Sequence, residues 1–260
     1  MSSRAIIKAE ILSGLRNYRF LIVAASFLFF AVMTPVMTKL VLPGVLRSAY
    51  PDIAPEVMEA MFSMTHAESI RSYLSDIFQI GTLIVAFVFS GIIAQELSER
   101  TLILPVCTGK RYGEIVVAKI LVNGTILMLT TTAAAMANYY YSGLMFGFTM
   151  TSISAVLRAG LLQGLYMVFV LSMLMLVGAV VRKHIATGLL TLIPAYGIGV
   201  IGSLLRIDRF LPSGLMTEAQ MLALLPSTAM LQSVICTVAV IVVTVAFTTL
   251  RLGNMELAKG

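Results

Sequence analysis

Charged residues are scarce in this 260-residue chain: they make up 12% of the sequence, whereas 59% of its residues are hydrophobic. In soluble proteins roughly a quarter of the residues are charged. A chain of this composition cannot cover an apolar core with a polar surface, which excludes an ordinary soluble domain. The mean hydropathy of +0.97 indicates an integral membrane protein instead.

Cysteine and histidine are also rare, with two residues of each. Cys107 and Cys236 provide neither a disulfide framework nor a CxxC metal pair. His66 and His184 fall in different loops between the apolar stretches, and the motifs H-E-x-x-H and G-x-S-x-G are missing. We therefore expect no catalytic residue, metal site or bound cofactor in this chain, and an intramembrane enzyme is disfavoured.

The nucleotide-binding motifs that the sequence approaches are incomplete. Gly109-Lys110 resembles the end of a Walker A loop, but that motif needs a glycine five residues before Gly109, and residue 104 is Leu. Without that glycine the loop cannot cradle phosphates with its backbone N–H groups. We therefore expect that this chain does not bind ATP itself.

Two groups of glycines lie inside apolar stretches. Residues 197–202 read GIGVIG, which matches the dinucleotide-binding fingerprint, but the segment sits inside an apolar run and no strand precedes it. Small residues allow membrane helices to approach closely. We interpret both groups as helix-packing positions, namely Gly160 and Gly164 in the first group and Gly197, Gly199 and Gly202 in the second.

Six apolar stretches are long enough to cross ~30 Å of hydrocarbon. They cover residues 20–42, 77–94, 115–141, 153–181, 188–205 and 229–250. Each is expected to be helical, because backbone polar groups in hydrocarbon must be satisfied within their own segment. The predicted fold is an all-α integral membrane protein, with six transmembrane helices in a single domain over residues 1–260.

Lysine and arginine are distributed unequally between the two predicted sides of the membrane. Two thirds of them lie in the N-terminal residues, in residues 95–119, at 182–183 and in the C-terminal tail. The positive-inside rule therefore predicts that both termini are cytoplasmic. This asymmetry and anionic lipid headgroups account for the net charge of +6, so membrane lipid rather than nucleic acid is the expected contact.

The N-terminal residues 3–17 carry an apolar residue at every fourth position, at Ile7, Ile11 and Leu15, whereas Arg16 and its charged neighbours are polar. This pattern predicts a short amphipathic helix that lies in the membrane interface. On the outer side, residues 43–76 and 206–228 form two longer segments that contain prolines and amphipathic stretches. We expect each outer segment to include a short surface helix.

A polar stretch separates the second and third apolar runs, where residues 96–114 read ELSERTLILPVCTGKRYGE. Its apolar centre is flanked by charges. The centre consists of Leu102, Ile103, Leu104 and Val106, and the charged rim consists of Glu96, Glu99, Arg100, Lys110 and Arg111. Glu114 ends the stretch. An apolar anchor with a charged rim is typical of a protein–protein contact. The alternative is a solvated loop whose cations face lipid headgroups.

The spacing of residues through this stretch resembles that of the ABC-2 family of transporter permeases. In that family a Glu leaves the second helix, Thr-Leu follows, a basic turn comes next, and Glu-Ile and a Lys begin the third helix. The matching residues here are Glu96, Thr101-Leu102, the turn at 108–111, Glu114-Ile115 and Lys119. Two features depart from the pattern: Arg100 replaces a common Gly, and the turn contains Gly109 and an early basic pair in place of the usual Pro and Arg.

The resemblance implies the membrane subunit of an ATP-driven ABC exporter in the bacterial cytoplasmic membrane. In such a protein, residues 95–114 form a coupling helix that inserts into a groove on a separate ATP-binding subunit, and the N-terminal helix packs beside it. ATP and Mg²⁺ bind to that partner subunit. Two permease chains, either identical or related, complete the transporter.

The expected cargo is amphiphilic, such as a peptide, an antibiotic or a lipid-like molecule, because the spans offer apolar and uncharged polar groups. The alternative function is a secondary carrier or channel that works without an ATPase partner. Two absences count against it. The interiors of the predicted spans contain no carboxylate that could couple transport to an ion, since Asp76 stands only at the outer edge of the second span. The sequence also shows no internal repeat.

Overall fold

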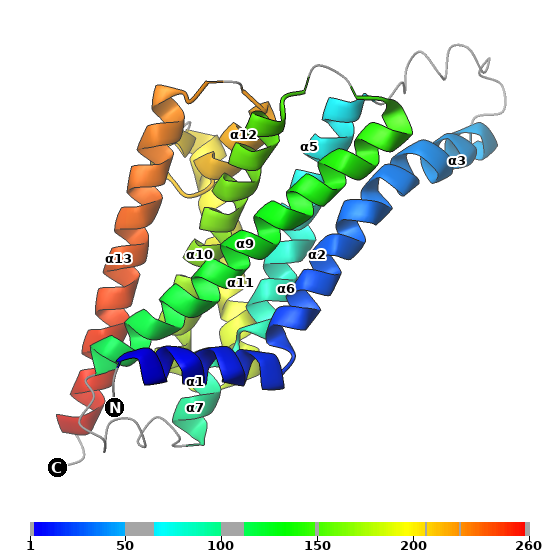
Figure 1. Cartoon of the computed structure of the whole chain (residues 1–260). Coiled ribbons are helices and arrows are strands. Elements are labelled where there is room, and N and C mark those ends of the chain that lie inside the picture. Colours follow the sequence, from blue (N-terminus) through cyan, green and yellow to red (C-terminus); the bar gives the residue numbers. More distant parts are fainter. Residues whose placement is uncertain are drawn as a thin grey trace.

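The computed structural model describes residues 3–49, 65–99, 112–148, 151–205, 207–223 and 225–257, and these residues form helices joined by short turns (Figure 1). In chain order the helices are α1 (Ser3–Arg16), α2 (Arg19–Val36), η1 (Met37–Val41), α3 (Leu42–Ala49), α5 (His66–Asp76), η2 (Ile77–Gly81), α6 (Thr82–Val88), α7 (Gly91–Ser98), α9 (Tyr112–Phe146), α10 (Ile153–Val181), α11 (His184–Leu205), η3 (Asp208–Phe210), α12 (Gly214–Met221) and α13 (Thr228–Leu257). The described residues contain no strand, as the sequence predicts.

Six helical stretches are long and apolar enough to cross a membrane, which confirms the predicted multi-pass membrane fold. They cover Arg19–Val45, His66–Ser98, Tyr112–Phe146, Ile153–Val181, His184–Leu205 and Thr228–Asn254. The fourth has the same limits as the predicted span over residues 153–181. α1 and the end of α13 lie at the same end of the bundle, and we call this the terminal end (Figure 1).

The second membrane helix begins eleven residues earlier than the sequence analysis placed it, at His66 rather than at residue 77. A capping box starts the helix: the Thr65 side chain accepts a hydrogen bond from the Glu68 backbone, and the Glu68 carboxylate accepts one from the Thr65 backbone. Residues 66–76 of the expected outer segment are therefore helical. Asp76 lies inside a continuous helix, where it accepts a 2.7 Å hydrogen bond from the Thr34 hydroxyl.

This second membrane helix is irregular at two places. It widens to a π-helix over Ile77–Gly81 and breaks at Phe89 and Ser90, where the Ser90 hydroxyl donates to the Phe87 carbonyl at 2.7 Å. The break separates α6 from α7, so the last eight residues of the helix, Gly91–Ser98, can take their own direction at the terminal end. α7 ends just before residues 100–111, which lie outside the described residues.

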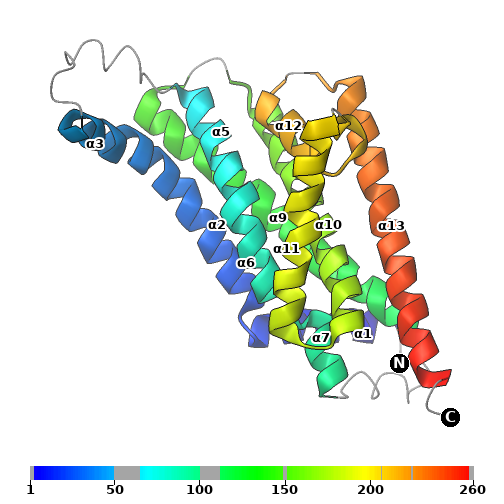
Figure 2. The same ribbon diagram turned by 180° about the vertical axis from the view of Figure 1, so that it is seen from behind.

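α10 forms the centre of the bundle and packs against α9, α13, α12, α11 and α7 (Figures 1 and 2). Its closest contact is with α9. A Cβ atom added at Gly164 would stand 2.9 Å from the Met128 Cα, and one added at Gly160 would stand 3.0 Å from the Thr132 Cα. Both glycines therefore allow the two helix backbones to meet without an intervening side chain.

Gly197, Gly199 and Gly202 of α11 do not have this role within the chain. Open space surrounds Gly197, and a Cβ added at Gly199 would meet Ser213 at an ordinary 3.7 Å. Gly202 packs against Asp208 and Leu211, which belong to the turn after α11 and not to another membrane helix. The reason is that α11 lies at the periphery of the bundle, where only 22% of its most apolar 18-residue stretch is buried.

Alanine substitutions at two glycines test these different environments. We expect Gly164→Ala to lower the melting temperature in detergent, because the new methyl group would overlap the α9 backbone and strain of this kind costs about 1–3 kcal/mol. Gly197→Ala is the matched control, since it adds the same atom to open space in a helix. Equal melting temperatures for the two variants would contradict the described α9–α10 contact.

Candidate functional site

The candidate site lies at the terminal end, where α1 meets α7 and α9, which are distant from it in the sequence (Figure 1). α1 lies across this end of the bundle and packs against α9 and α2. α7 ends there, and α9 begins there. These two helices flank residues 100–111, so the described structure includes the borders of the predicted coupling segment but not its centre.

Several of the predicted site residues therefore lie outside the described residues. They are Arg100, Thr101, Leu102, Ile103, Leu104, Lys110 and Arg111. Glu96, Glu99 and Glu114, which border this segment, are described. Glu99 is exposed at the end of α7 and accepts a 2.8 Å hydrogen bond from Gln95. Glu114 is exposed in the first turn of α9, where a negative charge interacts favourably with the helix dipole.

A buried ion cluster joins α1, α7 and α9. Lys119 is only 3% exposed, and its Nζ atom lies 2.8 Å from the Glu10 carboxylate and 2.6 Å from the Glu96 carboxylate. Asn123, one turn further along α9, donates to the other Glu10 oxygen at 3.1 Å. The cluster thus connects the N-terminal helix to both helices that flank residues 100–111.

The carboxylates of this ion cluster outnumber its ammonium groups by two to one. Two carboxylates, Glu10 and Glu96, share the single ammonium group of Lys119, and the positive charge of Arg19 also acts on Glu96. A buried charge is tolerated only when it is paired and hydrogen-bonded, and removing one partner typically costs about 3–5 kcal/mol. The ion cluster therefore holds α1 in a fixed position against α7 and α9.

α1 turns its small and acidic residues inward and its apolar row outward. Glu10 and Gly14 are buried, whereas Ile7, Ile11 and Leu15 are 38%, 38% and 56% exposed. Gly14 fits because the Phe20 ring occupies the space where a side chain would stand. Arg16, the last residue of α1, is exposed. The exposed apolar row is the same one that the sequence pattern identifies.

The pairing of Glu10 with Lys119 is the part of the ion cluster that the amphipathic pattern does not reveal. Glu10 falls among the polar residues of the predicted N-terminal helix, whereas the structure buries it against Lys119. A signal was present, because Glu10 is the only acidic residue in the first 51 positions and Lys119 lies inside an apolar run. A lysine inside a membrane helix requires a partner of opposite charge.

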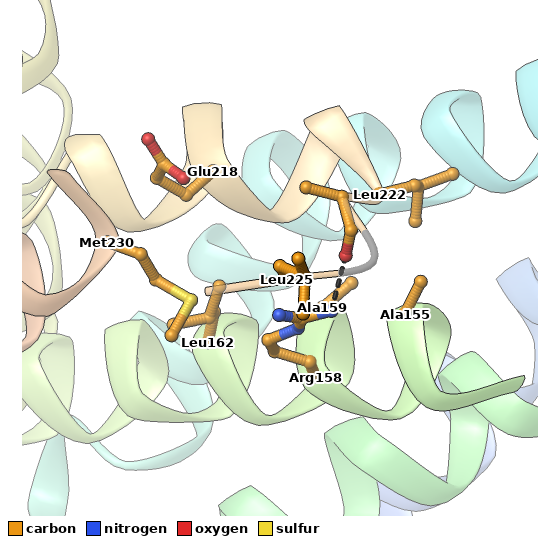
Figure 3. A pocket seen from close by; sticks show the side chains of 9 residues that line it. Ala155, Arg158, Ala159, Leu162, Glu218, Leu222, Leu225 and Met230 are labelled. Carbon is orange, nitrogen blue, oxygen red and sulfur yellow. Dashed lines mark hydrogen bonds between the residues drawn. The ribbon is translucent and has the colours of Figure 1, made fainter. Parts of the chain in front are cut away.

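The opposite end of the bundle contains a second charged cluster, but its role is to hold α12 in place (Figure 3). Arg158 of α10 donates to the Ala223 carbonyl, and Arg71 of α5 donates to the Gln220 carbonyl at 3.0 Å. Both arginines thus satisfy carbonyl groups at the C-terminal end of α12. The adjoining cavity of about 10 Å³ has room for little more than a water molecule.

Comparison with known proteins does not assign this chain to a family. No protein-family model matches the sequence, and no curated protein matches it. The functional conclusion therefore depends on the residues and the geometry of the chain itself.

Replacing Lys119 tests the ion cluster. We expect Lys119→Met to destabilise the protein by about 3–5 kcal/mol, because it leaves Glu10 buried without its charged partner. The measurement is reversible unfolding in detergent, and Lys8→Met, at an exposed lysine of α1, is the control that should leave stability unchanged.

A double variant separates lost charge pairing from lost packing. Glu10→Gln combined with Lys119→Met removes both members of the pair, so its destabilisation should be smaller than the sum of the two single effects. Additive effects would mean that Glu10 and Lys119 do not interact in the folded protein.

Proposed function

We propose that this chain is the membrane subunit of an ATP-driven exporter of the ABC-2 type. The observation that carries the proposal is the ion cluster. Glu96 and Lys119, two residues of the family pattern, meet there at 2.6 Å, and Lys119 also binds Glu10 of the N-terminal helix at 2.8 Å. The ion cluster thereby links the helices on both sides of residues 100–111, so a partner subunit that pushes this segment would also move those helices.

In the proposed mechanism the ion cluster transmits movement. A separate subunit binds ATP and Mg²⁺, closes on nucleotide and pushes residues 100–111. Because Lys119 ties α7 to both α9 and α1, these three helices move as one unit rather than separately. α9 packs along α2 and α10, so the movement reaches the helices that form the bundle. Such coupling requires two conformations that nucleotide binding biases differently.

A second permease copy, either identical or related, completes the proposed transporter. The helices available to contact it are those that the chain leaves most exposed. In the most apolar 18-residue stretch of each helix, 22% is buried in both α11 and α13, compared with 61% in α10. The cargo would be an amphiphile that moves between the two bundles, and we place both termini in the cytoplasm of a bacterial cell, with α1 in the membrane interface.

One observation favours the second candidate function, a secondary carrier without an ATPase. Asp76 lies within the second membrane helix, where it accepts a hydrogen bond from Thr34. Carboxylates inside membrane helices are typical of ion-coupled transport. A carrier of this kind would lose transport in an Asp76→Asn variant and on addition of a protonophore, whereas the exporter would retain transport as long as ATP is supplied.

Purification of the tagged chain from its native membrane tests the exporter. We expect a subunit with a P-loop, identified by mass spectrometry, to co-elute and to hydrolyse ATP. Arg100→Glu and Arg111→Glu should each reduce its amount about tenfold, because charge reversal at a contact costs on the order of 1.4 kcal/mol or more. Arg251→Glu, at an exposed arginine of the same end, is the matched control.

Two results would contradict the exporter. The first is elution of the chain from active membranes with no ATP-binding subunit. The second is transport that persists unchanged in the Arg100→Glu and Arg111→Glu variants while ATP is depleted.

A further inference from the structure

A recess of about 340 Å³ opens at the terminal end of the bundle. It lies between the turn that joins α1 to α2, the break between α6 and α7, and the start of α11. Its volume falls in the lower part of the range of small-molecule sites. Among the described residues no carboxylate lines it. It shares only Gln95 with the predicted coupling segment and no residue with the ion cluster.

Backbone irregularities create the recess. Tyr18 adopts a left-handed conformation, with φ of 55°, and reverses the chain between α1 and α2. The break at Phe89 and Ser90 shifts α7 relative to α6. Gly91 then keeps the space open, since a Cβ atom there would lie 3.7 Å from the Arg19 guanidinium and only 2.8 Å from the Gln95 side-chain oxygen.

One part of the recess is polar and carries the positive charge of Arg19. Arg19 and His184 both line it, and the His184 imidazole offers an N–H donor. The planar fork of an arginine matches the oxygens of a phosphate group. His184 begins α11, a helix of 22 residues, and the first N–H groups of a helix together with its dipole favour an anion at this place.

The acidic residues nearby are engaged elsewhere. Glu96 attracts Arg19, but it binds Lys119 directly at 2.6 Å, and Glu99 accepts a hydrogen bond from Gln95. The ion pairs among the described residues do not include Arg19. The guanidinium therefore keeps donors that an anion in the recess can use.

The other part of the recess is apolar and faces the surroundings of the bundle. Ile22 and Phe87, which are 46% and 40% exposed, line it together with Val88. α6 contacts both α2 and α11, so the three helices form one continuous face (Figure 2). Leu83 of α6, which is 42% exposed, lies one helical turn before Phe87 on the same side of α6.

We propose that this recess binds an anionic phospholipid from the surrounding membrane. The headgroup phosphate lies between Arg19 and His184, and the first part of an acyl chain lies against Ile22 and Phe87. A cationic end beside an apolar wall fits a molecule that has both parts, and the exposed face beyond the recess provides a path for the rest of the chain. This site is independent of ATP-driven export, since binding requires no partner subunit.

Binding of fluorescent lipids to the purified, delipidated chain in a nonionic detergent tests the site. Phosphatidylglycerol and phosphatidylcholine with the same acyl chains serve as the probes, so only the headgroup differs. We expect phosphatidylglycerol to bind about tenfold more tightly, a ratio that corresponds to about 1.4 kcal/mol. Phosphatidylcholine carries the same phosphate, but its quaternary ammonium group adds a positive charge that is repelled by Arg19. Inorganic phosphate at the same concentration should compete poorly, because it cannot use the apolar wall.

Variants locate the binding within the recess. Arg19→Gln and His184→Gln should each weaken phosphatidylglycerol binding about tenfold and weaken phosphatidylcholine binding less, so that the difference between the two lipids narrows. His184 is exposed, so its substitution does not threaten folding, and Arg251→Gln is the control cation on α13. Equal affinity for the two lipids, unchanged binding in the His184→Gln variant, or full competition by inorganic phosphate would each overturn the proposal.

Discussion

The buried Lys119 ammonium group is the constraint on which the terminal end of this protein depends. A lysine that is 3% exposed in an apolar bundle needs carboxylates, and the chain provides Glu10 and Glu96 from two different helices. The three side chains can satisfy one another only if α1 crosses the bundle end and α7 turns toward α9. One ion cluster thus determines the relative positions of three helices around residues 100–111.

The remainder of the bundle is held by a different type of contact. α9 and α10 meet backbone to backbone at Gly160 and Gly164, while α11 and α13 remain largely exposed. Outer helices that are this exposed can contact lipid or, in the proposed exporter, a second copy of the permease. In that proposal the ion cluster transmits movement, and the exposed helices contact another chain or lipid.

The helices could largely be predicted from the sequence, because length and apolarity alone decide which segments cross a membrane. The predicted span at residues 153–181 coincides with α10. Apolarity alone places the start of the second helix too late, because residues 66–76 are largely polar. The sequence signal for the true start is the capping box formed by Thr65 and Glu68. Burial of Glu10 could not be derived from periodicity, because it depends on a lysine 109 positions away. The recess was unpredictable as well, since it arises from a left-handed residue and a helix break.

The most direct test of the account is hydrogen exchange along α1 in the membrane-embedded protein, compared between the natural chain and its Lys119→Met variant. If the ion cluster holds α1 in place, exchange across Ser3–Arg16 accelerates about tenfold or more in the variant, while exchange in α13 stays the same. Unchanged protection of α1 would contradict the account, because it would mean that packing alone holds this helix against the bundle.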